Sequence, residues 1–148
     1  MISASNIYLV GPMGVGKTTV GKALAKSLGM DFIDSDQQIE DRTGVSISTI
    51  FDIEGEEGFR KREAQMIFEL VQKKNIVLAT GGGAVAREDV RKVMRHNGLV
   101  IYLHATVEML VERTRSSKNR PLLNSDKEPR EVLESLMRER EPLYRAEA

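Results

Sequence analysis

Residues 11–18 read Gly-Pro-Met-Gly-Val-Gly-Lys-Thr and match the pattern G-x-x-x-x-G-K-[ST]. In that pattern the glycines let backbone N–H groups turn toward phosphate oxygens, and the following helix points its positive N-terminus at them. Lys17 would reach the β- and γ-phosphates, and the Thr18 hydroxyl would ligate Mg²⁺. The alternative is a glycine-rich turn that binds nothing, but a chance match arises in only about 1% of chains of this length. The segment therefore predicts a nucleotide phosphate site.

A second polar cluster, Asp34-Ser35-Asp36, follows a short apolar run and so lies at the carboxyl end of a predicted strand. Ligands bind at that edge of open α/β sheets. A kinase needs one carboxylate to hold Mg²⁺, directly or through water, and another to orient or deprotonate an acceptor hydroxyl. The competing interpretation is that Asp34 or Ser35 caps a helix predicted over residues 37–43. The phosphate motif upstream favours the functional interpretation.

Helical phase separates Arg60 from its neighbours in a helix predicted over about residues 56–73. Arg60 falls about 100° around the helix from Phe59, inside the arc of apolar residues, whereas Lys61 falls outside it. A guanidinium on an apolar face needs an anionic partner, because burying it alone is costly. Glu63 is a candidate partner at i,i+3. The other candidate is the carboxylate of a small molecule, which a guanidinium grips with two hydrogen bonds.

The same phase pattern recurs near the end of the sequence. In a helix predicted over about residues 129–140, Arg140 falls on the apolar side and Arg138 on the opposite side. Two inward arginines on separate helices suit a small carboxylate, but a structural role for each is an equal alternative at this point.

Gly81-Gly82-Gly83 comes directly after another predicted strand. Three consecutive glycines let backbone N–H groups approach a ligand closely, whereas a plain tight turn needs only one. Further along, basic residues gather in and before a polar stretch: Arg113, Arg115, Lys118 and Arg120. Such a run is usually a solvated face. Beside a phosphate site it favours a lid over about residues 112–127, with Arg120 as the cation brought onto the transferring phosphoryl group.

Elements that would position these residues can be identified from apolar runs. Four short runs predict strands: Ile7–Val10, Phe32–Ile33, Ile76–Ala79 and Leu99–Leu103. Helical patterns are predicted after the phosphate motif and at about 56–73, 106–115 and 129–140. The buried stripe of the first helix is expected to be Val20, Ala23, Leu24 and Leu28. Strands alternating with helices predict an α/β fold, a three-layer α/β/α sandwich around a parallel sheet.

The 148 residues are expected to form a single domain, 1–148, with an acceptor-binding region at about 34–62. Lys and Arg number 22, as do Asp and Glu, so the zero net charge argues against nucleic-acid or anionic-membrane partners. The chain has no cysteine, which excludes a disulfide scaffold and a cysteine-ligated zinc site. No basic leader precedes the first apolar run, which is too short to span a membrane. The expected location is the cytoplasm.

Together these segments resemble the shikimate kinase family. The motifs G-P-M-G-V-G-K-T, D-S-D, G-E-E-G-F-R, A-T-G-G-G, R-P-L-L and R-E-P-L-Y occur in the family's order and approximate spacing, from residue 6 to the end. The resemblance implies a P-loop NTPase fold whose visible strands lie in the order 2-3-1-4, and a monomer. It also implies an Mg²⁺-dependent enzyme that transfers the ATP γ-phosphoryl group to the 3-hydroxyl of shikimate, on the route to chorismate and the aromatic amino acids.

The resemblance also implies residue roles. ATP would be bound by Gly14, Val15, Gly16, Lys17, Thr18, Thr19, Arg113 and Arg120, with Arg113 lying against adenine. Thr18 would ligate Mg²⁺ directly and Asp34 through water. Shikimate would be bound by Asp36, Arg60, Gly82, Arg140, Phe51 and Phe59. In that set the two arginines hold the carboxylate, the two phenylalanines wall the pocket, and Gly82 contacts the substrate by its backbone. The catalytic residues would be Lys17, Asp36 and Arg120, with Asp36 binding the acceptor hydroxyls and serving as the base.

The family continues past the P-L-Y segment with a further strand, an adenine-contacting loop and a last helix, whereas this sequence stops at Ala148. We therefore expect a four-stranded sheet with an exposed edge where a fifth strand belongs, and an incomplete adenine pocket. Two other functions stay open from the residues: a gluconate or nucleoside-monophosphate kinase, and an ATP-binding module without activity. Two inward arginines and an Asp beside the acceptor argue against a nucleotide acceptor, which would favour base-recognition features. The combination of Asp36, Arg60 and Arg140 also argues against a module without activity.

Overall fold

The computed structural model describes residues 6–12, 15–104 and 129–147. Over these ranges the chain forms a parallel sheet of four strands in the order β2-β3-β1-β4. The strands are β1 (Ile7–Val10), β2 (Asp31–Asp34), β3 (Ile76–Ala79) and β4 (Leu99–Tyr102). Both the predicted strand positions and the predicted order are confirmed. Because the strands are parallel, the carboxyl ends of β1, β2 and β3 bring the three predicted chemical segments to one edge.

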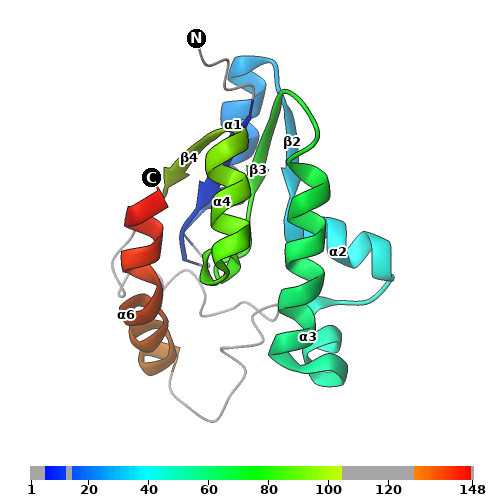
Figure 1. Cartoon of the computed structure of the whole chain (residues 1–148), viewed down its shortest axis with the longest axis vertical. Helices are drawn as coiled ribbons and strands as arrows, with labels where there is room; N and C mark the ends of the chain where they lie inside the picture. Colours follow the sequence, from blue (N-terminus) through cyan, green and yellow to red (C-terminus); the bar gives the residue numbers. More distant parts are fainter. Residues whose placement is uncertain (1–5, 13–14, 105–128, 148) are drawn as a thin grey trace.

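Helices connect the strands and flank the sheet. They are α1 (Lys17–Leu28), α2 (Ser35–Thr43), α3 (Ile47–Leu70), α4 (Glu88–Asn97) and α6 (Pro129–Glu147), with a 3₁₀ turn at Ala84–Ala86. Figure 1 shows α3 and α4 in front of the strands, with α6 on the β4 side. No helix among the described residues is long and apolar enough to cross a membrane. The helix predicted at 106–115 lies outside the described residues.

Side chains alternate between two cores on the two faces of the sheet. Tyr8 and Val10 of β1 belong to the larger core, which α3, α4 and α6 cover. Leu9, between them in sequence, joins a smaller core with Ala25 of α1. All three β1 side chains are fully buried. The sheet is therefore sandwiched between helices, as the alternation of strands and helices predicted.

The predicted stripe of α1 is wrong except at Leu24, which is partly buried against the smaller core. Val20 and Leu28 are 42% and 53% exposed, and the inward face of α1 instead carries Gly21 and Ala25. A Cβ on Gly21 would lie only 2.5 Å from the Phe32 ring. The helix therefore packs so close to the sheet that only small residues fit beneath it, which overrides the apolar periodicity.

The helix α3 is longer than predicted and is kinked at Gly55. It begins after Ser46, whose side chain caps it by accepting a hydrogen bond from the N–H of Thr49 at 3.1 Å. Gly55 has φ 74° and ψ 177°, a conformation open in practice only to glycine. The kink lets Phe51, before it, meet Phe59, after it, with ring centroids 4.9 Å apart. The two predicted pocket walls therefore touch.

One helix, α4, was missing from the sequence-based prediction. Its signals are present in the sequence: Glu88 and Asp89 in the first turn favour a helix N-terminus, and Val90 and Met94 follow at i,i+4 spacing. Both apolar residues are buried against the sheet. With α4 included, every two strands that follow one another in the sequence are connected through at least one helix, as parallel strands require.

Candidate active site

The phosphate motif forms the turn from β1 to α1. Gly11 and Gly16 have φ of 146° and 101°, and a Cβ on Gly11 would collide with the carbonyl of Leu103. No side chain caps the start of α1, and its first turn contains no acidic residue. Lys17 is 9% exposed and donates from Nζ to the carbonyls of Gly11 (2.6 Å) and Pro12 (2.9 Å). At this turn the N–H groups that begin α1 have no side-chain cap among the described residues, and the Lys17 ammonium lies against the carbonyls of the loop. Both features suit the binding of an anion.

Asp34 satisfies both interpretations offered for it. One carboxylate oxygen caps α2 by accepting from the N–H groups of Asp36 (2.9 Å) and Gln37 (3.2 Å). The other accepts from the Thr18 hydroxyl at 3.0 Å. The cap holds the carboxylate in place, and the contact with Thr18 brings together two oxygen ligands of the kind that Mg²⁺ prefers.

Asp36 lies at the centre of the charged groups. Its Oδ1 is buried and has no hydrogen-bond partner among the described residues. The pKa of Asp36 is raised from 3.8 to about 7, chiefly by burial and also by the nearby Glu63 and Asp34 carboxylates. Lys17 and Arg60 act in the opposite direction. A carboxyl group with a pKa near neutral, between the lysine of the phosphate loop and an arginine, is suited to proton transfer.

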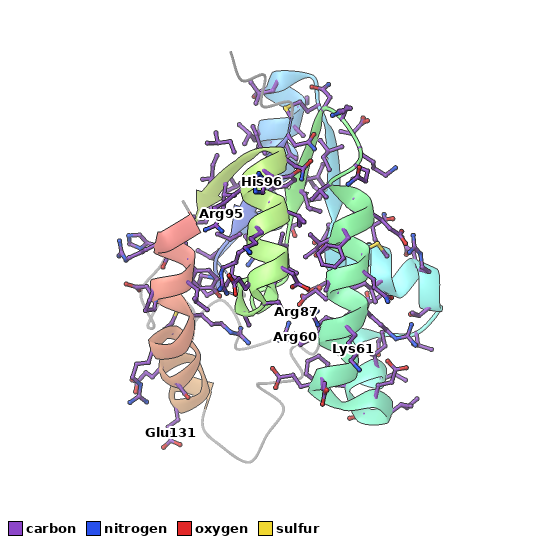
Figure 2. All side chains as sticks on the ribbon, in the orientation of Figure 1. Arg60, Lys61, Arg87, Arg95, His96 and Glu131 are labelled. Carbon is purple, nitrogen blue, oxygen red and sulfur yellow. The ribbon has the colours of Figure 1, made fainter. Side chains whose placement is uncertain are left out.

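Arg60 points inward, as its helical phase predicted. Its side chain is 14% exposed and donates to Glu63 at 2.8 Å, while Glu56 lies 3.5 Å away. The guanidinium also lies 5.2 Å from the centre of the Phe59 ring. Figure 2 shows Arg60 on the side of α3 that faces α4, whereas Lys61 is exposed. The predicted i,i+3 pair with Glu63 is confirmed, so Arg60 has a structural anion as well as a place beside Asp36.

Glu63 is the functional neighbour that sequence reasoning underrated. It is 2% exposed, and its Oε2 has no hydrogen-bond partner among the described residues. Burial raises the pKa of Glu63, and Arg60 and Arg140 lower it. Glu63 therefore interacts with both inward arginines: it forms an ion pair with Arg60, and the charge of Arg140 also lowers its pKa. Its place beside Arg60 was readable from the i,i+3 spacing, but its proximity to Asp36 and Arg140 depends on packing between helices.

The second inward arginine is also confirmed. Arg140 is 6% exposed, whereas Arg138 is exposed. Arg140 hydrogen-bonds the side chain of Tyr144, one turn further along α6. The Tyr144 hydroxyl in turn donates to the carbonyl of Gly82. Sequence reasoning missed Tyr144 as part of the site, although its i,i+4 spacing from Arg140 was a usable signal.

The glycine triplet after β3 makes room for these charged groups. A Cβ on Gly81 would lie 2.6 Å from Glu63 Oε2 and 3.0 Å from Asp36 Oδ1. A Cβ on Gly83 would collide with the guanidinium of Arg60. The triplet therefore does more than turn the chain, because a side chain at Gly81 or Gly83 would force the acids or Arg60 to shift.

The structure thus brings Lys17, Thr18, Asp34, Asp36 and Arg60 to one edge of the sheet, with Gly82 and Arg140 beside them. Val15, Gly16 and Thr19 lie in or next to the phosphate turn. Gly14, Arg113 and Arg120 lie outside the described residues, as does the predicted lid. Such a site can hold phosphates on one side and a small anionic acceptor on the other.

Comparisons with known proteins point the same way. Residues 13–148 match the family model described as shikimate kinase. A shikimate kinase from Histophilus somni is 56% identical over 144 residues, which cover 97% of this chain and 82% of that protein. The structure of a shikimate kinase from Acinetobacter baumannii in complex with shikimate superposes with a TM-score of 0.95 at 50% identity, covering 99% of this chain and 81% of the other.

A gluconokinase from Sinorhizobium meliloti shares the fold alone. It is 17% identical with a TM-score of 0.56, over 91% of this chain and 74% of the other. The family match and the relatives at 50% identity or more decide the family: the chain belongs to the shikimate kinases.

Proposed function

We propose that the protein transfers the γ-phosphoryl group of ATP to the 3-hydroxyl of shikimate, giving shikimate 3-phosphate and ADP on the route to chorismate. The observation that carries this proposal is the position of Asp36 between Lys17 of the phosphate loop and the inward Arg60, with the buried Arg140 acting on the neighbouring Glu63. A phosphate donor bound at Lys17 and a carboxylate acceptor bound at Arg60 would meet at that carboxyl group. A binding module does not account for the pair of arginines, and the gluconokinase is only 17% identical to this chain, against 50% or more for the shikimate kinases from Histophilus somni and Acinetobacter baumannii.

On the donor side, the N–H groups of residues 14–19 would cradle the phosphates. Lys17 would leave the carbonyls of Gly11 and Pro12 and reach the β- and γ-phosphates, an exchange of neutral for ionic acceptors that favours binding. Arg113 would lie against adenine, and Arg120 would bring a positive charge to the transferring group when a lid at about 112–127 closes. This lid and an acceptor-binding region at about 34–62 would be parts of the single domain.

Thr18 and Asp34 fit a magnesium ion. Their oxygen atoms are 3.0 Å apart, and Asp34 is held by its two backbone N–H donors. In the described part of the chain, no group of three or more acidic, histidine or cysteine side chains is arranged so that it could hold a metal ion. This suits Mg²⁺, which is usually held by few protein ligands together with phosphates and water. Thr18 would hold the ion directly and Asp34 through water, and the ion would neutralise charge on the phosphates.

On the acceptor side, Arg60 and Arg140 would hold the shikimate carboxylate, with Gly82 contacting the substrate by its backbone. Phe51 and Phe59 would wall the pocket; Phe59 is buried and Phe51 is partly exposed. Glu63 already balances the arginines, so their side chains are ordered before substrate arrives. This preorganisation lowers the entropic cost of binding a small anion.

In the chemical step, Asp36 would accept the proton of the 3-hydroxyl as the oxygen forms a bond to the γ-phosphorus. The bond from that phosphorus to the β–γ bridging oxygen would break, and ADP would leave with the electron pair. Lys17 and Arg120 would stabilise the charge on the transferring group. The pKa of about 7 suits Asp36 to this role, because it releases and accepts a proton near neutral pH.

The enzyme is proposed to act as a monomer in the cytoplasm, where ATP is available. Its proposed partners are ATP and shikimate alone, with no nucleic acid or membrane, in line with its zero net charge.

The position of the new phosphate tests this proposal. Shikimate, ATP and Mg²⁺ are incubated with the protein, and the product is analysed by ³¹P and ¹H NMR. We expect a single phosphate ester whose phosphorus couples to the proton on carbon 3. A phosphate on another hydroxyl, or the same product from the Asp36→Asn variant at an equal rate, would contradict the proposed acceptor geometry.

A further inference from the structure

Tyr144 joins two groups that the proposed function places against the substrate: Arg140, on its carboxylate, and the backbone of Gly82. It is 1% exposed, and its hydroxyl donates to the Gly82 carbonyl while Arg140 hydrogen-bonds it. A guanidinium can only donate, so the tyrosine oxygen accepts from Arg140 and donates to Gly82. One atom thus connects α6 to the glycine turn after β3.

The aromatic ring of Tyr144 is itself fixed. It stacks on Tyr102 of β4 with ring centroids 5.2 Å apart and planes inclined by 19°. Burial raises the pKa of Tyr144 to about 12, so the hydroxyl keeps its proton at every pH at which the enzyme would work. The hydrogen bond to Gly82 is therefore permanently available, and the stacked ring limits the directions in which the hydroxyl can point.

The two hydrogen bonds have consequences on both sides. Arg140 is held by an acceptor outside the substrate pocket, which restricts a side chain that otherwise loses considerable rotamer entropy on binding. The carbonyl of Gly82 is held in one direction, and because the peptide unit is planar, the N–H of Gly83 is fixed in the opposite direction. Glycine has no side chain to set this orientation itself.

We propose that Tyr144 is a positioning residue of the acceptor site, whose hydroxyl ties the Arg140 guanidinium to the Gly82 carbonyl and so fixes the guanidinium for the substrate carboxylate and the glycine turn beside it. This inference rests on the proposed function, since it assigns Tyr144 to the same site. Its role is specific to the carboxylate end of the acceptor and does not extend to ATP.

The chain offers a matched set of variants, because it contains only three tyrosines and all are described. Tyr144→Phe removes the hydroxyl and keeps the stacked ring. Tyr102→Phe keeps the ring that stacks on Tyr144 and removes its hydroxyl, which is buried without a hydrogen-bond partner among the described residues. Tyr8→Phe removes a buried hydroxyl that accepts from Asn6 at 3.0 Å, remote from the glycine turn, and so reports loss of a structural hydrogen bond alone.

Steady-state kinetics of the three variants test the proposal, at a temperature well below each melting point. We expect Tyr144→Phe to raise the KM for shikimate about tenfold, as loss of a hydrogen bond to a charged group does, with kcat and the KM for ATP within about twofold. Tyr102→Phe and Tyr8→Phe should keep the wild-type KM values. An unchanged shikimate KM in Tyr144→Phe, or an equal rise in Tyr8→Phe, would overturn the proposal.

A double-mutant cycle separates positioning from general loosening of α6. If Tyr144 acts through Arg140, then adding Tyr144→Phe to Arg140→Lys should raise the shikimate KM much less than it does in the wild type. Preference for shikimate over its methyl ester should also fall in Tyr144→Phe. Additive effects, or an unchanged preference, would contradict positioning. A wild-type protein without shikimate turnover would instead overturn the proposed function, and this inference with it.

Discussion

The burial of Asp36 lowers the stability of the fold, and the same burial raises the pKa of its carboxyl group into the range that suits proton transfer. The residues that bury it are also the ones that would bring it to the substrate: Glu63 from α3, the Gly81 backbone after β3, and Lys17 from the phosphate loop. Only the last is placed near Asp36 by a recognisable motif. The carboxyl group therefore acquires its unusual pKa from contacts among separate elements.

Replacing Asp36 with Asn should remove most of the turnover. The amide keeps the size of the side chain but cannot accept the hydroxyl proton, and loss of a general base typically costs about 10²–10⁴-fold in rate. ATP affinity, measured by isothermal titration calorimetry, should stay within about twofold, because Asp36 is not assigned a contact with the nucleotide. Turnover equal to that of the wild type would remove Asp36 from the mechanism.

The same variant should be more stable than the wild type, in a pH-dependent way. A raised pKa means that the folded protein holds the proton between about pH 4 and 7 while the unfolded chain releases it, so wild-type stability falls as pH rises through this range. Each pKa unit corresponds to about 1.4 kcal/mol, so the advantage of Asp36→Asn grows to at most about 4 kcal/mol above pH 7. Urea unfolding of the ligand-free proteins at pH 5 and pH 8 measures it. An advantage that is equal at both pH values would contradict the raised pKa.

Substitutions at Arg60 and at its exposed neighbour Lys61 test which side of α3 faces the acceptor. Arg60→Lys keeps a positive charge beside Glu63, which protects the fold, but loses the planar fork that grips a carboxylate. We expect the KM for shikimate to rise at least about tenfold. Lys61→Ala, on the exposed side of α3, should change neither KM nor kcat. A large effect at Lys61 would refute the orientation of α3 relative to the acceptor.

Among the elements, the strands were the most predictable and the helices the least. Short runs rich in Ile, Val and Leu identify β1, β3 and β4, and the two apolar residues Phe32–Ile33 were enough to locate β2. Phase within a helix also placed Arg60 and Arg140 correctly, since each lies in a helix with one clearly buried side. The face of α1 was wrong because Gly21 controls how closely that helix approaches Phe32, which periodicity does not reveal.

The kink in α3 is the element most sensitive to a single substitution. Gly55→Ala should destabilise the protein by about 1–3 kcal/mol, because a Cβ is strained at φ 74° and ψ 177° although it would meet no atom within 4 Å. The KM for shikimate should rise as well, since the kink sets Phe51 against Phe59. Urea unfolding and steady-state kinetics check both effects.

Gly44→Asn is the matched control for Gly55→Ala. Gly44 also has a positive φ, 76°, with no atom within 4 Å of a Cβ, but its ψ of 9° lies toward the left-handed region that asparagine tolerates. Gly44→Asn should lower the free energy of unfolding clearly less than Gly55→Ala does. If Gly55→Ala were the milder of the two, the kink would not be a constraint of the backbone.

At the scale of the whole molecule, the charged residues that are buried in the described part of the chain lie at one edge of the sheet. Lys and Arg balance Asp and Glu at 22 each, and the buried charged residues Lys17, Glu63 and Arg140 belong to the proposed site. The approximate location of the site could be predicted, because parallel strands end at the same edge. The close packing of the glycine turn against Asp36 and Arg60 could not be predicted. It depends on contacts between elements that are distant in sequence, and the sequence does not show how closely these elements approach.

The most direct test of the account is the choice of acceptor. ADP release is followed by a coupled assay with Mg²⁺-ATP and, in separate reactions, shikimate, gluconate and nucleoside monophosphates. The account predicts turnover that depends on shikimate, with little above background for the other acceptors, because the chain belongs to the shikimate kinases and nucleoside monophosphates lack the carboxylate that the arginines would hold. Turnover with gluconate or a nucleotide in place of shikimate, or none with shikimate in the folded protein, would contradict it.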